Sequence, residues 1–434
     1  MKINKYTLVR SCRLLREGSH TTDLRDILIS HTDSGNFIKK LEPEILPEGL
    51  DAPVTLYNAK GMLALPAFLD MHVHLREPGF EYKEDIATGT AAAAAGGYAA
   101  VLAMPNTKPV CDSPETVRYI LNKASKVGSC SVYTTAAITK GLKGEELVDF
   151  DALTEAGAAA FTDDGRPVTD SALMMEAMRR CAAHDRLIIS HSEELSLAEG
   201  GAINAGPVAD HLKVKGIPNA AEDIMIAREI ILAEETGCRL HIAHVSTKGG
   251  LELVRQAKKR GVRVTCETCP HYFAMKDSDV VFYGTNAKMN PPLRSAEDVD
   301  AVIEAIKDGT VDCISTDHAP HSPAEKNQPL SKAPNGIIGI QTAFSAGITY
   351  LVMPGHITLA RLVELMTTSP AKILRAPDYS GKIEVGERAN FCIVNPDEEY
   401  IVTQSMLKSK SSNTPFLGLS LRGAIHKTFN QTTR

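Results

Sequence analysis

Histidine and acidic side chains gather where apolar segments of the chain end, which is the arrangement expected of a metal site. One apolar segment ends in Asp-Met-His-Val-His-Leu-Arg at residues 70–76. Alternate residues of a strand share a face, so His72, His74 and Arg76 are expected to project together. Two adjacent imidazoles can bind a zinc ion. Taken alone, the pair is explained equally well by two hydrogen-bonded structural histidines.

Four later segments end in the same residue types. These ends are Thr162-Asp163-Asp164-Gly165, Ser190-His191-Ser192-Glu193, Ala243-His244-Val245-Ser246 and Thr316-Asp317-His318-Ala319-Pro320-His321. The chain has only 14 histidines, so their concentration at segment ends argues against a purely structural explanation.

The ligand set is chemically coherent, because imidazole and carboxylate suit zinc and two zinc ions about 3.5–4 Å apart need an anion between them. We expect His72 and His74 to bind one ion, and His191 and His244 the other. One carboxylate of residues 163–164 would lie between the ions. Asp317 would complete the first site and move a proton between water and a leaving nitrogen.

Eight apolar β-type runs alternate with helical patterns over the middle of the chain. The expected strands are 63–74, 99–104, 131–138, 158–163, 187–191, 239–244, 262–267 and 312–316, and the expected helices are 83–95, 114–126, 171–183, 221–236, 249–260 and 296–307. This alternation predicts an α/β fold, a (β/α)₈ barrel of the TIM type with its active site at the carboxyl ends of the strands. An open doubly wound sheet is the alternative, but the chain lacks a phosphate-binding glycine fingerprint.

Short β-type runs occupy both ends of the chain. They cover residues 6–10, 27–30 and 54–58, then a strand–turn–strand pattern over 381–394 and a last strand near 423–426. We therefore expect residues 1–60 and 376–434 to form one small β-sandwich-like module beside a metal-dependent barrel of residues 61–375.

The composition excludes several classes of protein. The net charge is −6 without a lysine or arginine block, which argues against nucleic-acid and membrane-surface partners. The nine cysteines are an odd, scattered number, and the C-x-x-C of Cys266 and Cys269 has no second pair to complete a zinc knuckle, which indicates reduced thiols and a cytoplasmic protein. The first 18 residues lack the apolar core of a signal peptide, and no run reaches the ~20 apolar residues of a membrane span.

Four motifs give the chain a resemblance to a known family. D-M-H-V-H-L-R-E-P-G (70–79), M-P-N-T (104–107), M-N-P-P-L-R (289–294) and T-D-H-A-P-H (316–321) occur in this order. With them the chain resembles dihydroorotases of the bacterial class I type, in the amidohydrolase superfamily. The resemblance covers nearly the whole chain and includes 381–390 and 409–418.

The resemblance implies a role for individual residues. The implied ligands of two Zn²⁺ ions are His72, His74, Asp164, His191, His244 and Asp317, with Asp317 also the general acid and base. The implied substrate contacts are His74, Arg76, Asn106, Asn290, His321, Asn335 and Gly336. The residues alone leave Asp163 and Asp164 as alternatives for the shared ligand, and the family pattern selects the one before glycine. Asn335 stands where relatives often have phenylalanine, which puts a side-chain role there in doubt.

The resemblance also implies the reaction, reversible hydrolysis of L-dihydroorotate to N-carbamoyl-L-aspartate in pyrimidine synthesis. The planar guanidinium of Arg76 suits the ring carboxylate of this small-molecule substrate. The alternatives are a hydantoinase or allantoinase, and an inactive dihydroorotase-like subunit supporting aspartate transcarbamoylase. The absence of a bridging lysine opposes the first, and the intact ligand set opposes the second. A homo-oligomer, most simply a dimer, and association with a transcarbamoylase are further expectations.

Overall fold

Eight parallel strands form the barrel in the computed structural model, which describes residues 2–15 and 21–432. The strands are β6 (Phe68–Val73), β7 (Tyr98–Ala103), β8 (Ser131–Ala136), β9 (Ala158–Phe161), β10 (Leu187–Ser190), β13 (Arg239–Ile242), β14 (Val264–Thr268) and β15 (Cys313–Ile314). Their spatial order follows their order in the chain. A parallel bridge between Val73 and His318 joins the first strand to the segment after the last one. The predicted (β/α)₈ barrel is confirmed.

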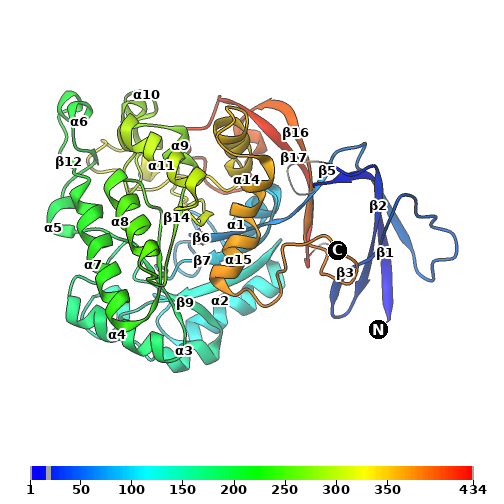
Figure 1. Ribbon diagram of the computed structural model, residues 1–434, viewed down its shortest axis with the longest axis horizontal. Helices are drawn as coiled ribbons and strands as arrows, with labels where there is room; N and C mark the ends of the chain where they lie inside the picture. Colours follow the sequence, from blue (N-terminus) through cyan, green and yellow to red (C-terminus); the bar gives the residue numbers. More distant parts are fainter. Residues whose placement is uncertain (1, 16–20, 433–434) are drawn as a thin grey trace.

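Helices surround the barrel on its outer side (Figure 1). The main ones are α1 (Ile86–Ala95), α2 (Pro114–Val127), α3 (Phe150–Ala156), α4 (Ser171–Ala183), α7 (Ala220–Thr236), α8 (Lys248–Lys259), α11 (Ala296–Asp308), α14 (Leu359–Met366) and α15 (Thr368–Leu374). The predicted start of α2 is confirmed, since the Ser113 side chain caps the helix and Pro114 takes its first position. No helix in the described part of the chain has the length and hydropathy that a membrane span requires.

The loops at the carboxyl ends of the strands contain short elements of their own. These are η2 (Lys140–Leu142), α5 (Leu195–Ala198), β11 (Ile203–Asn204), α6 (Pro207–Leu212), β12 (Gly216–Ile217), α9 (Pro270–Ala274), η3 (Asp277–Asp279), α10 (Val280–Tyr283), η4 (Gly284–Ala287), α12 (Pro323–Lys326), α13 (Ala343–Gly347) and the π-helix η5 (Ile348–Val352). Long loops at this end of a barrel are the usual carriers of its active site.

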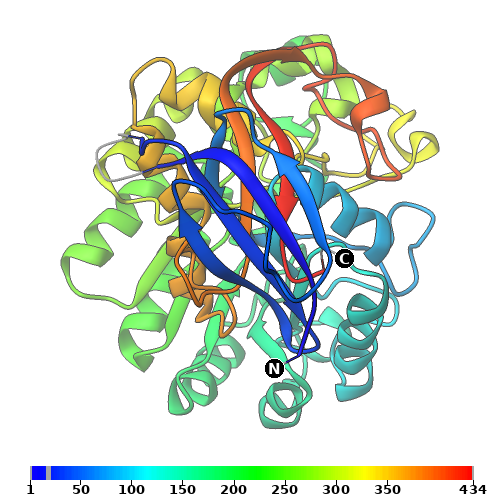
Figure 2. The ribbon, with the colours of Figure 1, turned by 90° about the vertical axis from the view of Figure 1, so that its right-hand side faces the viewer.

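The two ends of the chain meet in one sheet beside the barrel (Figures 1 and 2). Its strands are β1 (Ile3–Leu14), β2 (Arg25–Thr32), β3 (Gly35–Glu42), β4 (Val54–Asn58), β5 (Leu63–Pro66), β16 (Phe391–Ile401) and β17 (Ser420–Phe429), with η6 (Gln404–Met406) between the last two. β16 pairs with β5 and β17, and β5 pairs with β1. The expected union of the terminal segments is therefore observed.

Two predicted strands need correction. The run 63–74 is not one strand: β5 belongs to the terminal sheet, and the barrel begins at Phe68. Pro66 has no N–H with which to continue a ladder, and the Ala67 N–H donates to Asn390 O at 3.1 Å. The strand expected at the start of 381–394 is also absent, because Gly381 and Gly386, with φ of 68° and 92°, leave too few extended residues between them. The boundaries proposed at residues 61 and 376 stay predictions.

Candidate active site

The carboxyl ends of the barrel strands surround a cavity of about 200 Å³. The cavity is lined by His74, Arg76, Asn106, Asp164, Gly165, His191, His244, Asn290, Asp317, Ala319, His321, Asn335 and Gly336. His72 lies in contact with this group and is buried. The structure thus brings all twelve residues singled out in the sequence to one place.

Asp164 lies at the centre of the histidine cluster. Its Oδ1 is 3.3 Å from His72 Nε2, 3.6 Å from His191 Nδ1 and 4.0 Å from His244 Nε2. Its Oδ2 is 3.6 Å from His74 Nε2. A single carboxylate therefore contacts both pairs of histidines, as a shared ligand of two metal ions must.

The neighbouring Asp163 faces away from this cluster. Its Oδ1 accepts the N–H groups of Ile138 and Thr139 at 2.7 and 3.0 Å, and the Thr139 hydroxyl donates to Oδ2. Successive side chains of an extended segment point in opposite directions, which separates the two acids. Asp163 holds a loop, and Asp164 alone of the pair is placed to bind metal.

Asp317 lies beside the first pair of histidines. Its Oδ1 is 3.0 Å from His74 Nε2 and 3.7 Å from His72 Nε2. Burial opposes ionisation of this carboxyl, but the hydrogen bond from His74 and the charges of His72 and His74 lower its pKa to about 2. Asp317 is therefore a carboxylate at neutral pH.

The donor atoms fit metal ions. His72 Nε2, which faces Asp164, is buried and makes no hydrogen bond within the described residues. On the other side of Asp164, His191 Nδ1 and His244 Nε2 lie 3.0 Å from each other, so both ring nitrogens are near the shared carboxylate. An unpaired buried polar atom costs about 1–3 kcal/mol, which a bound ligand would offset. Burial, together with the charges of His191 and His72, lowers the pKa of His244 to about 3, so this imidazole is neutral in the metal-free site.

Three residues of the site adopt left-handed backbone conformations. Arg76, His244 and Asp317 have φ of 62°, 38° and 46°. Such conformations cost non-glycine residues about 1–3 kcal/mol and persist where the surrounding structure imposes them. They turn the chain sharply after β6, β13 and β15, which directs these side chains toward the cavity.

Arg76 has no acidic partner in the described part of the chain. Its Nε donates to Pro320 O at 3.1 Å, and its Nη2 lies 3.3 Å from His321 Nε2. Glu77 and Glu81, the neighbours that could have paired with it, instead accept hydrogen bonds from Tyr119 and Gly79. The guanidinium is therefore free to bind an anion in the cavity.

His321 and the turn at 335–336 form the wall beside Arg76. His321 Nε2–H donates to Asn335 O at 2.8 Å. Burial and the charges of Arg76, Lys83 and Lys326 lower the pKa of His321 to about 2, so its ring is neutral. Asn335 thus contributes its main-chain carbonyl to this wall.

We expect the substitution Gly336→Ala to disturb this wall. Gly336 has φ of 130°, and a Cβ there would lie 2.7 Å from the Ala319 Cβ and 3.2 Å from His321 Nε2. Left-handed backbone alone costs about 1–2 kcal/mol for a residue with a side chain. Urea unfolding should show at least this loss of stability, and unchanged stability would mean that the turn can relax.

The two asparagines both connect cavity residues. Asn106 Oδ1 lies 2.9 Å from His74 Nδ1, and its Nδ2 donates to Asp164 Oδ2 at 3.2 Å. Asn290 Nδ2 donates to Glu193 Oε1 at 2.9 Å, and Glu193 Oε2 is 3.6 Å from His191 Nε2. Besides lining the cavity, both asparagines hold site residues in place.

Glu193, which links Asn290 to His191 in this way, was not predicted to have a role in the site.

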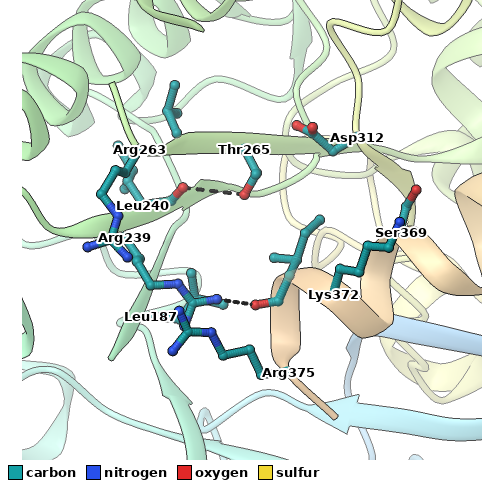
Figure 3. Close-up of a pocket in the computed structure, with 11 residues that line it drawn as sticks. Leu187, Arg239, Leu240, Arg263, Thr265, Asp312, Ser369, Lys372 and Arg375 are labelled. Atoms are coloured by element: carbon teal, nitrogen blue, oxygen red, sulfur yellow. Dashed lines mark hydrogen bonds between the residues drawn. The ribbon is translucent and has the colours of Figure 1, made fainter. Parts of the chain in front are cut away.

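A second cavity, of about 440 Å³, lies at the opposite, amino end of the strands (Figure 3). Arg239 and Arg375 point into it, but Arg375 and Arg263 share the carboxylate of Asp185, and Arg239 donates to main-chain carbonyls. Among the described residues, its lining contains no histidine and none of the predicted site residues. The predicted site residues lie at the other end of the barrel.

Two known families match separate parts of the chain. A dihydro-orotase-like family model matches residues 61–250, and an amidohydrolase family model matches residues 283–414. A dihydroorotase of Acetivibrio thermocellus is 47% identical over 424 residues, which cover 97% of this chain and 96% of that protein. A dihydroorotase of Ruminiclostridium cellulolyticum is 47% identical over 414 residues, with 95% of each chain covered. The chain belongs to the dihydroorotase family. The family expected from the motifs is thereby confirmed.

Solved structures of a hydantoinase and a dihydropyrimidinase share the fold of this dihydroorotase-family chain. An L-hydantoinase (dihydropyrimidinase) from Arthrobacter aurescens superposes with a TM-score of 0.85 at 25% identity, over 100% of this chain and 96% of that one. A dihydropyrimidinase from Brevibacillus agri gives a TM-score of 0.81 at 21% identity, over 98% and 94% of the two chains. These likenesses support the barrel, and the sequence relatives at 47% identity decide the family.

Proposed function

We propose that this chain hydrolyses L-dihydroorotate reversibly to N-carbamoyl-L-aspartate, as a cyclic-amide hydrolase of pyrimidine synthesis. The observation that carries the proposal is the Arg76 guanidinium, which pairs with no acid among the described residues and lies in a cavity that also holds the histidine–aspartate cluster. Dihydroorotate offers a carboxylate for the guanidinium and a ring amide for the cluster.

Different residues would bind the metal, transfer the proton and bind the substrate. His72, His74, Asp164, His191, His244 and Asp317 would hold two zinc ions. Zinc supplies a Lewis acid that activates water and polarises the amide carbonyl. The Asp317 carboxylate takes the proton of the attacking water and delivers it to the leaving ring nitrogen. Arg76 binds the substrate carboxylate in two-pronged fashion, and the wall formed by His321 and residues 335–336 holds the ring against it.

We expect two metal ions per chain at full loading. The six ligand residues are too many for one tetrahedral zinc, and Asp164 contacts histidines of both pairs. Chelation should abolish activity, and added zinc should restore it in proportion to metal bound, measured by elemental analysis. Full activity at one ion per chain, unchanged by added metal, would contradict the two-ion centre.

A hydantoinase or allantoinase is the second candidate, because hydantoinases share the fold. Their neutral rings have no carboxylate, so a buried Arg76 facing them would be left unpaired. Steady-state assays of dihydroorotate, hydantoin and allantoin with zinc-loaded protein separate the candidates. We expect turnover of dihydroorotate to exceed that of the others by orders of magnitude, and a preference for hydantoin would overturn the proposal. Turnover of none of the three would favour the inactive-subunit alternative.

The remaining expectations concern the metal, the oligomeric state, the cellular location and the protein partners of the enzyme. We propose zinc as the metal, a homo-oligomer as the working form, and the cytoplasm as its location. All nine cysteines are buried and free of disulfides, which supports a reducing compartment. Association with an aspartate transcarbamoylase stays a prediction.

A further inference from the structure

Glu267 is a fully buried carboxylate in the barrel interior, next to the histidine cluster. It belongs to β14, and its Oε1 is 3.2 Å from His72 Nδ1. Its Oε2 is 3.1 Å from His241 Nε2 and accepts the hydroxyl of Ser315. Three polar groups from three different strands or strand ends therefore converge on one carboxylate that does not line the cavity.

These contacts determine which nitrogen of His72 carries the proton. Among the described residues, Oε1 of Glu267 is the hydrogen-bond partner of His72 Nδ1, and a carboxylate oxygen is an acceptor, so Nδ1 is the nitrogen that carries the proton. The lone pair of Nε2 then points toward Asp164 and Asp317, which lie 3.3 and 3.7 Å away.

We infer that Glu267 is a positioning residue for metal binding: it fixes the ring orientation and the tautomer of His72 so that Nε2 is presented to the ion. A carboxylate on the far nitrogen also makes an imidazole a stronger ligand. The inference rests on the metal centre proposed above, because Glu267 acts only through His72.

A separate ion bound by Glu267 itself is the competing explanation. His241, Glu267 and Cys313 have ligand-type atoms within 4.8 Å of one another. Both oxygens of Glu267 are already engaged, however, and His241 Nδ1 lies 2.8 Å from Thr265 Oγ1. This geometry leaves His241 and Ser315 as supports of the carboxylate and gives a third ion no open position.

Glu267→Gln and Glu267→Ala separate the charge of this residue from its hydrogen bond. Glutamine keeps an oxygen for His72 Nδ1–H but loses the charge, whereas alanine loses both. Metal affinity, measured on apo-protein by titration against a competing chelator, should fall about tenfold in the first variant and up to about 100-fold in the second. Only the ion held by His72 should be affected, so one of two binding steps should weaken.

Glu229→Gln is the matched control. Glu229 is another fully buried carboxylate, paired with Arg228 on α7 and outside the barrel interior. Its loss should lower the melting temperature without changing metal affinity. Cobalt-loaded protein gives a second measurement, because the visible absorption of Co²⁺ reports ligand geometry and should change in the Glu267 variants alone.

The outcomes distinguish the inference from the proposed function. Unchanged metal affinity in folded Glu267→Gln protein, or an equal loss in Glu229→Gln, would overturn the positioning role. A parent protein that binds two ions but does not hydrolyse dihydroorotate would overturn the proposed function and leave this inference intact. A third ion lost on substitution would show that Glu267 is itself a ligand.

Discussion

Asp317→Asn is expected to keep most of the bound metal and to lose at least ~10²-fold in kcat, the usual scale of general acid–base catalysis. Asparagine has nearly the same shape and keeps an oxygen near His74 Nε2, which is 3.0 Å from Asp317 Oδ1. It cannot accept a proton from water at neutral pH, so the transfer to the leaving nitrogen fails. The comparison is made at equal metal content, determined for each preparation.

Asp312→Asn is a suitable control, because Asp312 lies just before β15 at its opposite end. Its carboxylate pairs with Lys258 and accepts the Cys266 N–H, so the substitution removes an acid from the same strand region without touching the cavity. This variant should retain the parent's kcat. If Asp317→Asn also retained most of it at equal metal content, the proton transfer would belong to another group.

The ligand residues could be predicted because strand ends have a simple geometry. Residues that follow strands of a parallel barrel meet at one end whatever the details of the loops, so His72, His191 and His244 could be brought together from the sequence alone. The shared acid could not be chosen in this way. Asp163 and Asp164 are adjacent, and the contacts of Asp163 with Ile138 and Thr139 exist only in the folded chain.

Other parts of the site depend on tertiary structure. No local pattern predicts left-handed backbone at Arg76, His244 and Asp317, because even histidine and aspartate adopt it only occasionally and the surrounding structure must impose it. Glu267 ends a predicted strand, and an acid at that position of an apolar segment was the available signal. Its role becomes visible only when the barrel closes and places it beside His72, which is 195 residues distant in sequence.

The split of the run 63–74 has a similar cause. Hydrophobicity continues through the whole segment, since both β5 and β6 are almost entirely buried. The two strands differ in their partners: β5 pairs with β16 from the far end of the chain, and β6 pairs with β7. Pairing between segments more than 300 residues apart produces no periodic pattern in the sequence. Only Pro66 indicates where β5 ends and a new strand begins.

Arg76→Lys is the test of substrate recognition. Lysine keeps the charge but cannot reproduce the two-pronged contact of a guanidinium with a carboxylate. Loss of a charge-assisted hydrogen bond in a partly dry site costs about 1.5–3 kcal/mol. At about 1.4 kcal/mol per decade, kcat/KM for dihydroorotate should fall by roughly one to two decades. The reverse reaction should fall equally, because N-carbamoyl-aspartate keeps the same carboxylate.

The decisive comparison uses a neutral ring. Dihydrouracil has no carboxylate, so its slow turnover should change far less than that of dihydroorotate, and metal content should stay the same because arginine is not a ligand. The Nε of Arg76 also donates to Pro320 O, which gives the side chain a structural contact as well. An equal loss for both substrates would therefore mean that Arg76 holds the cavity together and that the carboxylate is recognised elsewhere. A loss confined to dihydroorotate would establish Arg76 as the residue that distinguishes this substrate from the neutral rings of hydantoinases.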